Sequence, residues 1–198
     1  MAKINLGLDV LGKREDGYHE VRMIMQTIRM YDILDIRKTR RPGIVLTTNL
    51  PFIPTDQRNL VYKAAQMLME EFDVEEGLSI KLRKFIPVAA GMAGGSSDAA
   101  AAFVGVNRMF HLGLTEEQLM ERAVKVGADV PYCIMRGTAL AEGIGEKLTR
   151  LPEVPKCYVL IGKPGINVST KTAYENLNLE GIGKHPDIDG LIGAIRNN

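Results

Sequence analysis

One stretch near the middle of the chain, residues 87–103, joins a loop of very small residues to an alanine-rich segment. It reads PVAAGMAGGSSDAAAAF and follows residues 77–86, GLSIKLRKFI, whose apolar side chains alternate as in a half-buried strand. The predicted order is a strand, a loop of small residues and a helix. The N-terminus of a helix presents unpaired N–H groups and the positive end of its dipole, so it attracts anions. A loop without large side chains would let a phosphate reach that backbone.

The small residues of this loop have two interpretations. Glycines would permit the close approach of an anion, and serine hydroxyls would add donors at the start of the helix. The residues concerned are Gly91, Gly94, Gly95, Ser96 and Ser97. No lysine follows Gly95 and no G-x-G-x-x-G is present, so neither the Walker A nor the dinucleotide-binding pattern applies. The alternative is tight helix packing, with Ser97 or Asp98 as an ordinary N-cap.

Apolar periodicity predicts the remaining elements. Strands are expected at residues 2–10, 21–28, 32–38, 44–48, 77–86 and 157–164, with two more around the turn at Gly143 and Gly145. The first three strands suggest an antiparallel meander. Helices are expected at residues 58–72, at 114–127 with a Thr115/Gln118 capping box and a stop at Gly127, at 167–177 with Ser169 or Thr170 as cap, and from 189 onward.

Two prolines close together, Pro152 and Pro155, indicate a linker. We therefore expect an α+β fold with one domain over residues 1–154 and the beginning of a second over 155–198. The last helical pattern stops at Asn198, which suggests an incomplete second domain. Apolar surface left exposed there could drive self-association into a homo-oligomer.

Composition narrows the class of protein. Apolar residues make up 45% of the 198 and charged residues 25%, as in globular proteins. The formal net charge of +1 argues against a nucleic-acid partner or an anionic membrane surface, and no apolar run reaches the ~20 residues of a membrane span. Cys133 and Cys157 suggest reduced, buried thiols, so a cytoplasmic location is expected.

Asp129 and Lys3 are candidates for chemistry. Asp129 lies in GADVPYC, before Pro131, where it is either a simple N-cap or a carboxylate held rigidly enough to accept a hydroxyl proton. Lys3 would share a strand face with Asn5, and beside Asp129 it would keep the carboxylate ionised and neutralise a phosphoryl group. Alone, it would be a solvated lysine.

Tyr18 and His19 follow the Asp16-Gly17 turn and combine a stacking surface with a hydrogen-bonding ring, which would suit a nucleobase. The alternative is a tyrosine that packs on its own hairpin. His111 and His185 are far apart in the sequence and show no ligand spacing, so zinc is not expected, and the ligands of any other metal stay unknown.

Five segments taken together resemble the GHMP kinase superfamily, and within it a branch whose substrate carries cytidine. These segments are AKINL, DGYHEV, DQRNLVYKAA, PVAAGMAGGSSDAAAA and GADVPYC. The resemblance implies a GHMP-kinase N-terminal domain, like domain 2 of ribosomal protein S5, followed by the beginning of a ferredoxin-like C-terminal domain. It also implies transfer of the ATP γ-phosphoryl group, with Mg²⁺, to a small cytidine diphosphate sugar-alcohol of non-mevalonate isoprenoid biosynthesis.

Site residues follow from the same resemblance. It implies Lys3 and Asp129 as catalytic residues, and Asn5, Tyr18, His19 and Tyr174 as substrate-binding residues. The residues implied in ATP binding are Asn59, Pro87, Val88, Ala89, Ala90, Gly91, Met92, Ala93, Gly94, Gly95, Ser96 and Ser97.

Three alternatives stay open at this point. Another small-molecule kinase of the superfamily, such as a homoserine or mevalonate kinase, would lack the DGYH motif. An RNA-binding domain of the same fold would carry more positive charge. The superfamily's third, glycine-rich motif falls beyond Asn198, so a fragment that binds its ligands without turnover is the remaining alternative.

Overall fold

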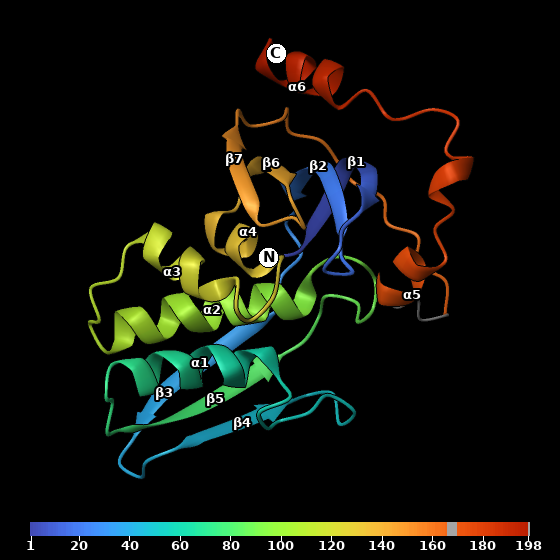
Figure 1. The fold of residues 1–198 in the computed structure, drawn as a ribbon. Helices are drawn as coiled ribbons and strands as arrows, with labels where there is room; N and C mark the ends of the chain where they lie inside the picture. Colours follow the sequence, from blue (N-terminus) through green and yellow to red (C-terminus); the bar gives the residue numbers. More distant parts are fainter. Residues whose placement is uncertain (166–169, 198) are drawn as a thin grey trace. The chain divides into compact units, whose positions relative to one another are not determined.

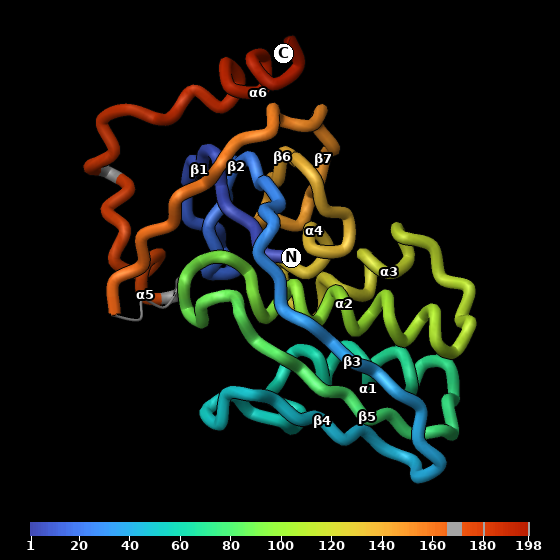
Figure 2. The backbone as a smooth tube through the Cα atoms, turned by 180° about the vertical axis from the view of Figure 1, so that it is seen from behind, coloured from blue at the N-terminus to red at the C-terminus, as the bar shows by residue number. Residues whose placement is uncertain are grey.

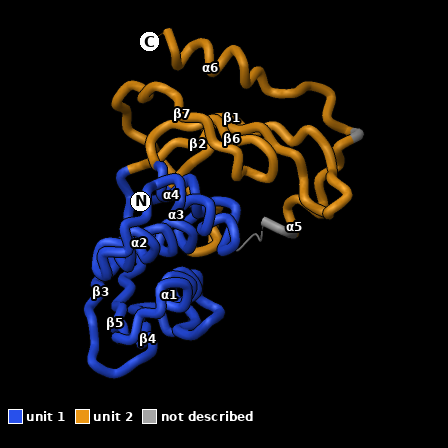
Figure 3. The backbone as a smooth tube through the Cα atoms, turned by 60° about the vertical axis from the view of Figure 1, so that its left-hand side comes forward, with its two compact units in different colours: residues 1–2, 29–87, 93–135 blue, residues 3–28, 88–92, 136–198 orange. Residues whose placement is uncertain are grey.

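The computed structural model describes residues 1–165 and 170–197, which form two compact units (Figure 3). Unit 1 contains residues 1–2, 29–87 and 93–135, and unit 2 contains residues 3–28, 88–92 and the described residues from 136 onward. Each unit combines a sheet with helices, so the expected α+β class is confirmed. The domain boundary expected at residue 154 stays a prediction.

The sheet of unit 1 has three strands in the order β3-β5-β4. Their bounds are Ile33–Thr39 for β3, Ile44–Thr48 for β4 and Gly77–Arg83 for β5. β5 pairs antiparallel with β3 and parallel with β4. Leu78, Ile80 and Leu82 alternate along the central strand β5 and are buried, which explains the period-2 pattern read from the sequence.

Two helices cover one face of this sheet (Figure 1), and the view from behind in Figure 2 shows the three strands in front of them. They are α1 (Leu60–Glu71) and α2 (Gly94–Met109), and α3 (Glu116–Ala123) and α4 (Val130–Met135) pack against α2. The capping box of Thr115 and Gln118 is present at the start of α3, as predicted. Phe103 and Val106 of α2 are fully buried.

The sheet of unit 2 is entirely antiparallel, in the order β1-β2-β6-β7. Its strands are β1 (Lys3–Lys13), β2 (His19–Thr27), β6 (Thr138–Glu142) and β7 (Lys147–Leu151). Beyond β7 come α5 (Thr170–Glu175), the short 3₁₀-helix η1 (Leu179–Gly181) and α6 (Ile188–Arg196). Thr170 is the first residue of α5, and Ser169 lies outside the described residues.

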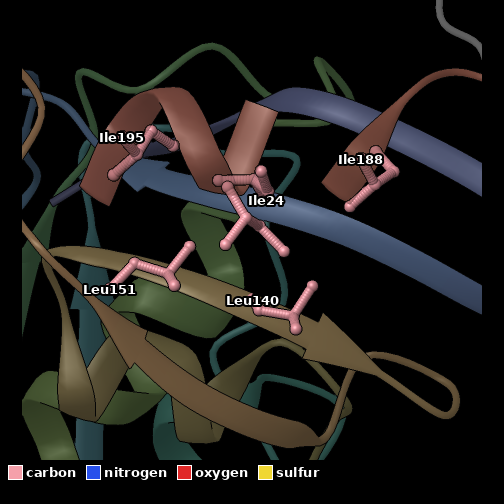
Figure 4. Packing of buried hydrophobic residues seen from close by; sticks show 6 residues of the cluster. Ile24, Leu140, Leu151, Ile188 and Ile195 are labelled. Atoms are coloured by element: carbon pink, nitrogen blue, oxygen red, sulfur yellow. The ribbon is translucent and has the colours of Figure 1, made fainter. Parts of the chain in front are cut away.

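Helix α6 packs on this sheet through an aliphatic core (Figure 4). Its buried face consists of Ile188, Ile192 and Ile195, which lie against Ile24 of β2, Leu140 of β6 and Leu151 of β7. At the edge of this core Arg22 donates two hydrogen bonds to the Asp189 carboxylate, at 2.7 and 2.6 Å. The helix predicted from residue 189 onward is thus confirmed.

Several predicted elements differ from the structure. The meander ends after β2, because β3 leaves that sheet and pairs with β5 instead. Residues 157–164 form no strand, and Tyr158 and Leu160 are fully exposed because no neighbouring strand pairs with this segment. Helix α3 stops at Ala123, four residues before Gly127. Cys133 is buried as expected, whereas Cys157 is exposed on the unpaired segment.

Candidate active site

The loop before α2 alternates the sign of its backbone φ angles. Ala89, Gly91 and Ala93 have φ of 53°, 68° and 52°, while the residues between them stay outside the positive region. A backbone of this kind turns successive N–H groups toward one side and forms an anion-binding nest. Two alanines in the left-handed region are strained, and such strain concentrates at ligand-binding loops.

Helix α2 begins at Gly94, so Ser96 and Ser97, expected at the start of the helix, lie within its first turn. Its N-cap residue, Ala93, supplies no side-chain hydrogen bond, so the interpretation of Ser97 or Asp98 as an ordinary N-cap is wrong. The first intrahelical bond of this end runs from the Ser97 N–H to the Ala93 carbonyl, at 2.8 Å. The N–H groups of Gly94, Gly95 and Ser96 come before this first intrahelical bond, which is the position at which helices bind anions.

Gly94 and Gly91, at and before the start of α2, are glycines for different structural reasons. A Cβ on Gly94 would lie 3.1 Å from Cγ2 of Ile86 and 3.2 Å from Nζ of Lys84, so the helix approaches the end of β5 too closely for a side chain. Gly91 needs its positive φ, and a Cβ there would meet nothing within 4 Å. Ser97 is buried, and its Oγ accepts a hydrogen bond of 2.6 Å from the Met1 ammonium group.

Asn59 acts as the N-cap of α1. Its Oδ1 accepts the Val61 N–H at 2.9 Å, and its Nδ2 donates to the Pro54 carbonyl at 2.7 Å. The side chain is buried and committed to the backbone on both sides. The structure therefore gives Asn59 a role in holding the start of α1, and its nearness to adenine stays a prediction.

Asp129 immediately precedes α4 and is half-buried. Its carbonyl accepts the Cys133 N–H at 3.1 Å, the first backbone bond of that short helix. Asp129 therefore occupies the position directly before α4 where the sequence predicts an N-cap. Asp129 belongs to unit 1 and Lys3 to unit 2, so their predicted partnership stays a prediction.

Lys3 is buried, with 6% of its surface exposed, so the interpretation of a solvated lysine is wrong. Its Nζ donates to Oδ1 of Asn5 at 3.2 Å, which confirms that the two side chains share one face of β1. Its backbone N–H donates to the carbonyl of Met92 at 3.1 Å, which attaches β1 to the small-residue loop. The structure thus brings two predicted site residues and one loop residue together within unit 2.

The β1–β2 hairpin presents the predicted aromatic residues. Tyr18 is 58% exposed, and its N–H donates to Asp16 Oδ1 at 3.0 Å within the turn. His19 begins β2, and its ring stacks on that of Tyr174 from α5, with centroids 5.0 Å apart and planes at 27°. Three residues predicted to bind a base are therefore found in unit 2, two of them in direct contact.

A buried ionic cluster in unit 1 was not predicted as part of a site. Asp32, Lys84 and Asp98 have side chains only 1%, 5% and 4% exposed. Lys84 Nζ donates to Asp98 Oδ2 at 2.6 Å and also to Asp32 Oδ2. Asp32 is far from the other two residues in the sequence, so no local pattern indicated that it joins them. The only hint in the sequence was that charged residues, Lys84 and Asp98, stand on either side of the loop.

Burial raises the pKa of Asp98 to about 7, although the nearby Lys84 ammonium opposes this effect. Burial would also raise the pKa of Asp32, but hydrogen bonds from Lys84 and from the N–H groups of Phe85 and Ile86 outweigh burial and lower it. The cluster therefore favours one ionised carboxylate on Asp32 and a carboxyl group on Asp98 that holds its proton near neutral pH.

Among residues 1–165 and 170–197, no group of three or more His, Cys, Asp or Glu side chains is arranged to hold a metal ion. The helices found in the same part of the chain are too short or too polar to cross a membrane.

Comparison with a protein-family model indicates the class of protein to which the chain belongs. Residues 59–137 match the GHMP kinases N terminal domain, and this segment includes the whole bare loop and Asp129. The loop, the uncapped α2 and the match together define a kinase of the GHMP class.

Curated relatives and a solved structure narrow the class. The 4-diphosphocytidyl-2-C-methyl-D-erythritol kinase of Lachnospira eligens is 56% identical over 195 residues, which cover 98% of this chain and 68% of the relative. The kinase of the same name from Lachnoclostridium phytofermentans is 58% identical over 98% of this chain and 67% of its own. The crystal structure of a 4-(cytidine 5'-diphospho)-2C-methyl-D-erythritol kinase matches with a TM-score of 0.79 and 31% identity, covering 99% of this chain and 69% of the other. The chain belongs to the 4-diphosphocytidyl-2-C-methyl-D-erythritol kinase family.

Proposed function

We propose that this chain transfers the γ-phosphoryl group of ATP to the 2-hydroxyl of 4-diphosphocytidyl-2-C-methyl-D-erythritol, in the methylerythritol phosphate route to isoprenoids. The observation that carries the proposal is the loop of alternating φ that leads into an uncapped α2. That backbone is suited to hold a polyphosphate. Family membership supports the nature of the acceptor.

In this reaction the acceptor oxygen forms a bond to the γ-phosphorus while the bond from that phosphorus to the β-phosphate oxygen breaks, and ADP leaves. Asp129 accepts the hydroxyl proton, and its position at the rigid start of α4 fits that task. Lys3 would offset the charge of the transferring group. Because phosphoryl transfer depends mainly on positioning and charge stabilisation, a fixed carboxylate and a buried ammonium are appropriate groups.

Mg²⁺ is part of the proposal. The ion takes most of its oxygen ligands from phosphates and water, so it does not need a cluster of protein carboxylates. The hydroxyl group of Ser96, in the first turn of α2, is a hard oxygen donor of the kind that it accepts, whereas Ser97 Oγ is buried and already accepts from the Met1 ammonium group. When bound, the ion would neutralise charge on the phosphates.

The cytidine end of the acceptor would bind at the β1–β2 hairpin. Tyr18 is exposed enough to stack on a base, and His19 and Tyr174 supply further ring surface and hydrogen-bonding groups. Asn5, hydrogen-bonded to Lys3, would contact the erythritol part. A cytoplasmic location is part of the proposal, and a homo-oligomer stays a prediction.

Calorimetric titration tests this proposal separately for each ligand. The chain is titrated with the cytidine substrate and with a non-hydrolysable ATP analogue, and the titrations are repeated on Tyr18→Ala. We expect Tyr18→Ala to weaken substrate binding at least tenfold and to leave binding of the analogue within twofold. Equal binding of the substrate by both proteins would refute the assignment of the cytidine site.

A further inference from the structure

The buried cluster of Asp32, Lys84 and Asp98 lies outside the residues to which catalysis or ligand binding was assigned. All three belong to unit 1, and the Lys84 ammonium group is the centre that hydrogen-bonds to both carboxylates. The cluster is almost completely shielded from water. Replacing a buried ion pair by apolar groups of the same volume often leaves a fold equally or more stable, so stability alone is a weak reason for these charges.

One side of the cluster holds the segment that enters the phosphate loop. Asp32 Oδ1 accepts the N–H of Phe85 and, at 2.8 Å, that of Ile86. These residues lie between Lys84, which directly follows β5, and Pro87, the first residue of the loop. Asp32 therefore fixes the entry to the loop through the backbone.

The other side of the cluster holds the exit from the loop. Asp98 is the fifth residue of α2, and its Oδ2 accepts a hydrogen bond of 2.6 Å from Lys84. Lys84 Nζ would lie only 3.2 Å from a Cβ on Gly94, the first residue of the helix. Since Lys84 itself is at the loop entry, a single side chain connects both ends of residues 87–93.

The electrostatics of the cluster also indicate a specific arrangement. An ammonium group against the N-terminus of a helix opposes the positive end of the helix dipole, so it needs the ionised Asp32 carboxylate beside it to remain there. Asp98 Oδ1 is buried and has no hydrogen-bond partner among the described residues. A buried carboxyl oxygen without a hydrogen-bond partner costs free energy. The contacts of the surrounding residues therefore have to keep Asp98 in this position.

We propose that Asp32, Lys84 and Asp98 clamp the two ends of the loop and thereby fix the direction of the first N–H groups of α2, which makes Lys84 and Asp98 positioning residues for the phosphates of ATP. The role in ATP binding depends on the proposed function. The clamp itself is a property of the loop and is measurable without any ligand.

The first test uses Asp98→Ala, which removes the contact to Lys84, and Asp98→Asn, which keeps an acceptor oxygen and the shape. We expect Asp98→Ala to raise KM for ATP at least tenfold with KM for the cytidine substrate within twofold, and Asp98→Asn to stay within threefold of the unmodified chain. A merely structural role would lower the melting temperature of Asp98→Ala and leave KM for ATP within twofold, which would overturn the proposal.

The second test is hydrogen exchange without ligand, on the same variants and on Lys84→Met with Lys81→Met as its control. Lys81 lies three residues earlier on β5 and is exposed. We expect exchange of residues 87–97 to accelerate at least tenfold in Asp98→Ala and Lys84→Met, with residues 99–109 still protected and Lys81→Met unchanged. Unchanged exchange in folded variants would overturn the clamp. If the unmodified chain bound no ATP analogue, the proposed function would fail, and exchange would still decide on the clamp.

Discussion

The rings of His19 and Tyr174 stack directly on each other, with centroids 5.0 Å apart. A base held between two rings needs them about 7 Å apart, because each ring-to-ring contact takes ~3.5 Å. If cytosine binds at this hairpin as proposed, it either stacks on the outside of this pair or separates the two rings. Both arrangements make Tyr174 part of the contact between the hairpin and α5.

Removal of the Tyr174 ring tests this contact. We expect Tyr174→Ala to raise KM for the cytidine substrate by about two- to twelvefold, since an aromatic contact contributes about 0.5–1.5 kcal/mol. KM for ATP should stay within twofold. Tyr158→Ala, which removes a fully exposed ring, is the control. Equal KM values for Tyr174→Ala and the unmodified chain would show that α5 does not bind the base.

The two adjacent glycines at the start of α2 should respond differently to alanine. At Gly94 a Cβ would press on Ile86 and Lys84 at 3.1 and 3.2 Å, whereas at Gly95 it would meet only Leu60 Cδ1 at an ordinary 3.6 Å. We expect Gly94→Ala to lower the free energy of unfolding by about 1–2 kcal/mol, and Gly95→Ala to change it by less than ~0.5 kcal/mol. Denaturant unfolding measures both. Equal effects would contradict the close approach of α2 to β5.

The pH dependence of stability tests Asp98. Its pKa of about 7 in the fold exceeds its usual 3.8, so between these values the folded state binds more protons than the unfolded state. Its contribution to the free energy of unfolding therefore falls as the pH rises from about 4 to 7. Asp98→Asn does not titrate, so between pH 5 and pH 8 its free energy of unfolding should rise relative to that of the unmodified chain by about 2–3 kcal/mol.

An exposed acid provides the control for this pH series. Asp35, hydrogen-bonded to Arg37, has a pKa lowered by that contact, so it is ionised in both states throughout the range. The difference in free energy of unfolding between Asp35→Asn and the unmodified chain should therefore stay constant from pH 5 to pH 8. If the difference in free energy of unfolding between Asp98→Asn and the unmodified chain were also constant, Asp98 would be ionised from pH 5 to pH 8, which would contradict its raised pKa.

Helix α6 should depend on its aliphatic core. Ile192 is 7% exposed and lies among Ile24, Leu140 and Leu151. We expect Ile192→Ala to lower the free energy that holds α6 on the sheet by about 2–4 kcal/mol, through lost burial and the cavity left behind. Hydrogen exchange of α6 measures this energy. The exposed Ala194→Ser should cost less than ~0.7 kcal/mol, and an equal loss in both variants would contradict the packing.

Local patterns predicted much of the fold. The alternation in β1 and β5, the capping box of α3 and the small residues before α2 each depend on neighbours in the sequence, so they could be recognised. The pairing of β3 with β5 could not, because the two strands are joined by a long connection and alternation is the same in either sheet.

The site residues also divide into features that the local sequence predicts and features that only the folded structure reveals. Lys3 and Asn5 share a face because they are two residues apart on a strand, and this was predictable. Helix α2 begins early because Ala93 adopts a left-handed conformation, which an alanine does not signal. Asp32 is 52 residues from Lys84 in the sequence, so only the folded structure reveals the cluster.

Asp129 is the proposed acceptor of the proton when the ATP γ-phosphoryl group is transferred to the 2-hydroxyl. The most direct measurement is the rate of formation of the phosphorylated cytidine substrate by the unmodified chain and by Asp129→Asn, at saturating ATP and substrate. We expect a product phosphorylated at the 2-hydroxyl and a rate at least 100-fold lower in Asp129→Asn, with both ligands still bound in calorimetric titrations. A rate for Asp129→Asn within tenfold of the unmodified chain, or phosphate on another hydroxyl, would contradict the proposal.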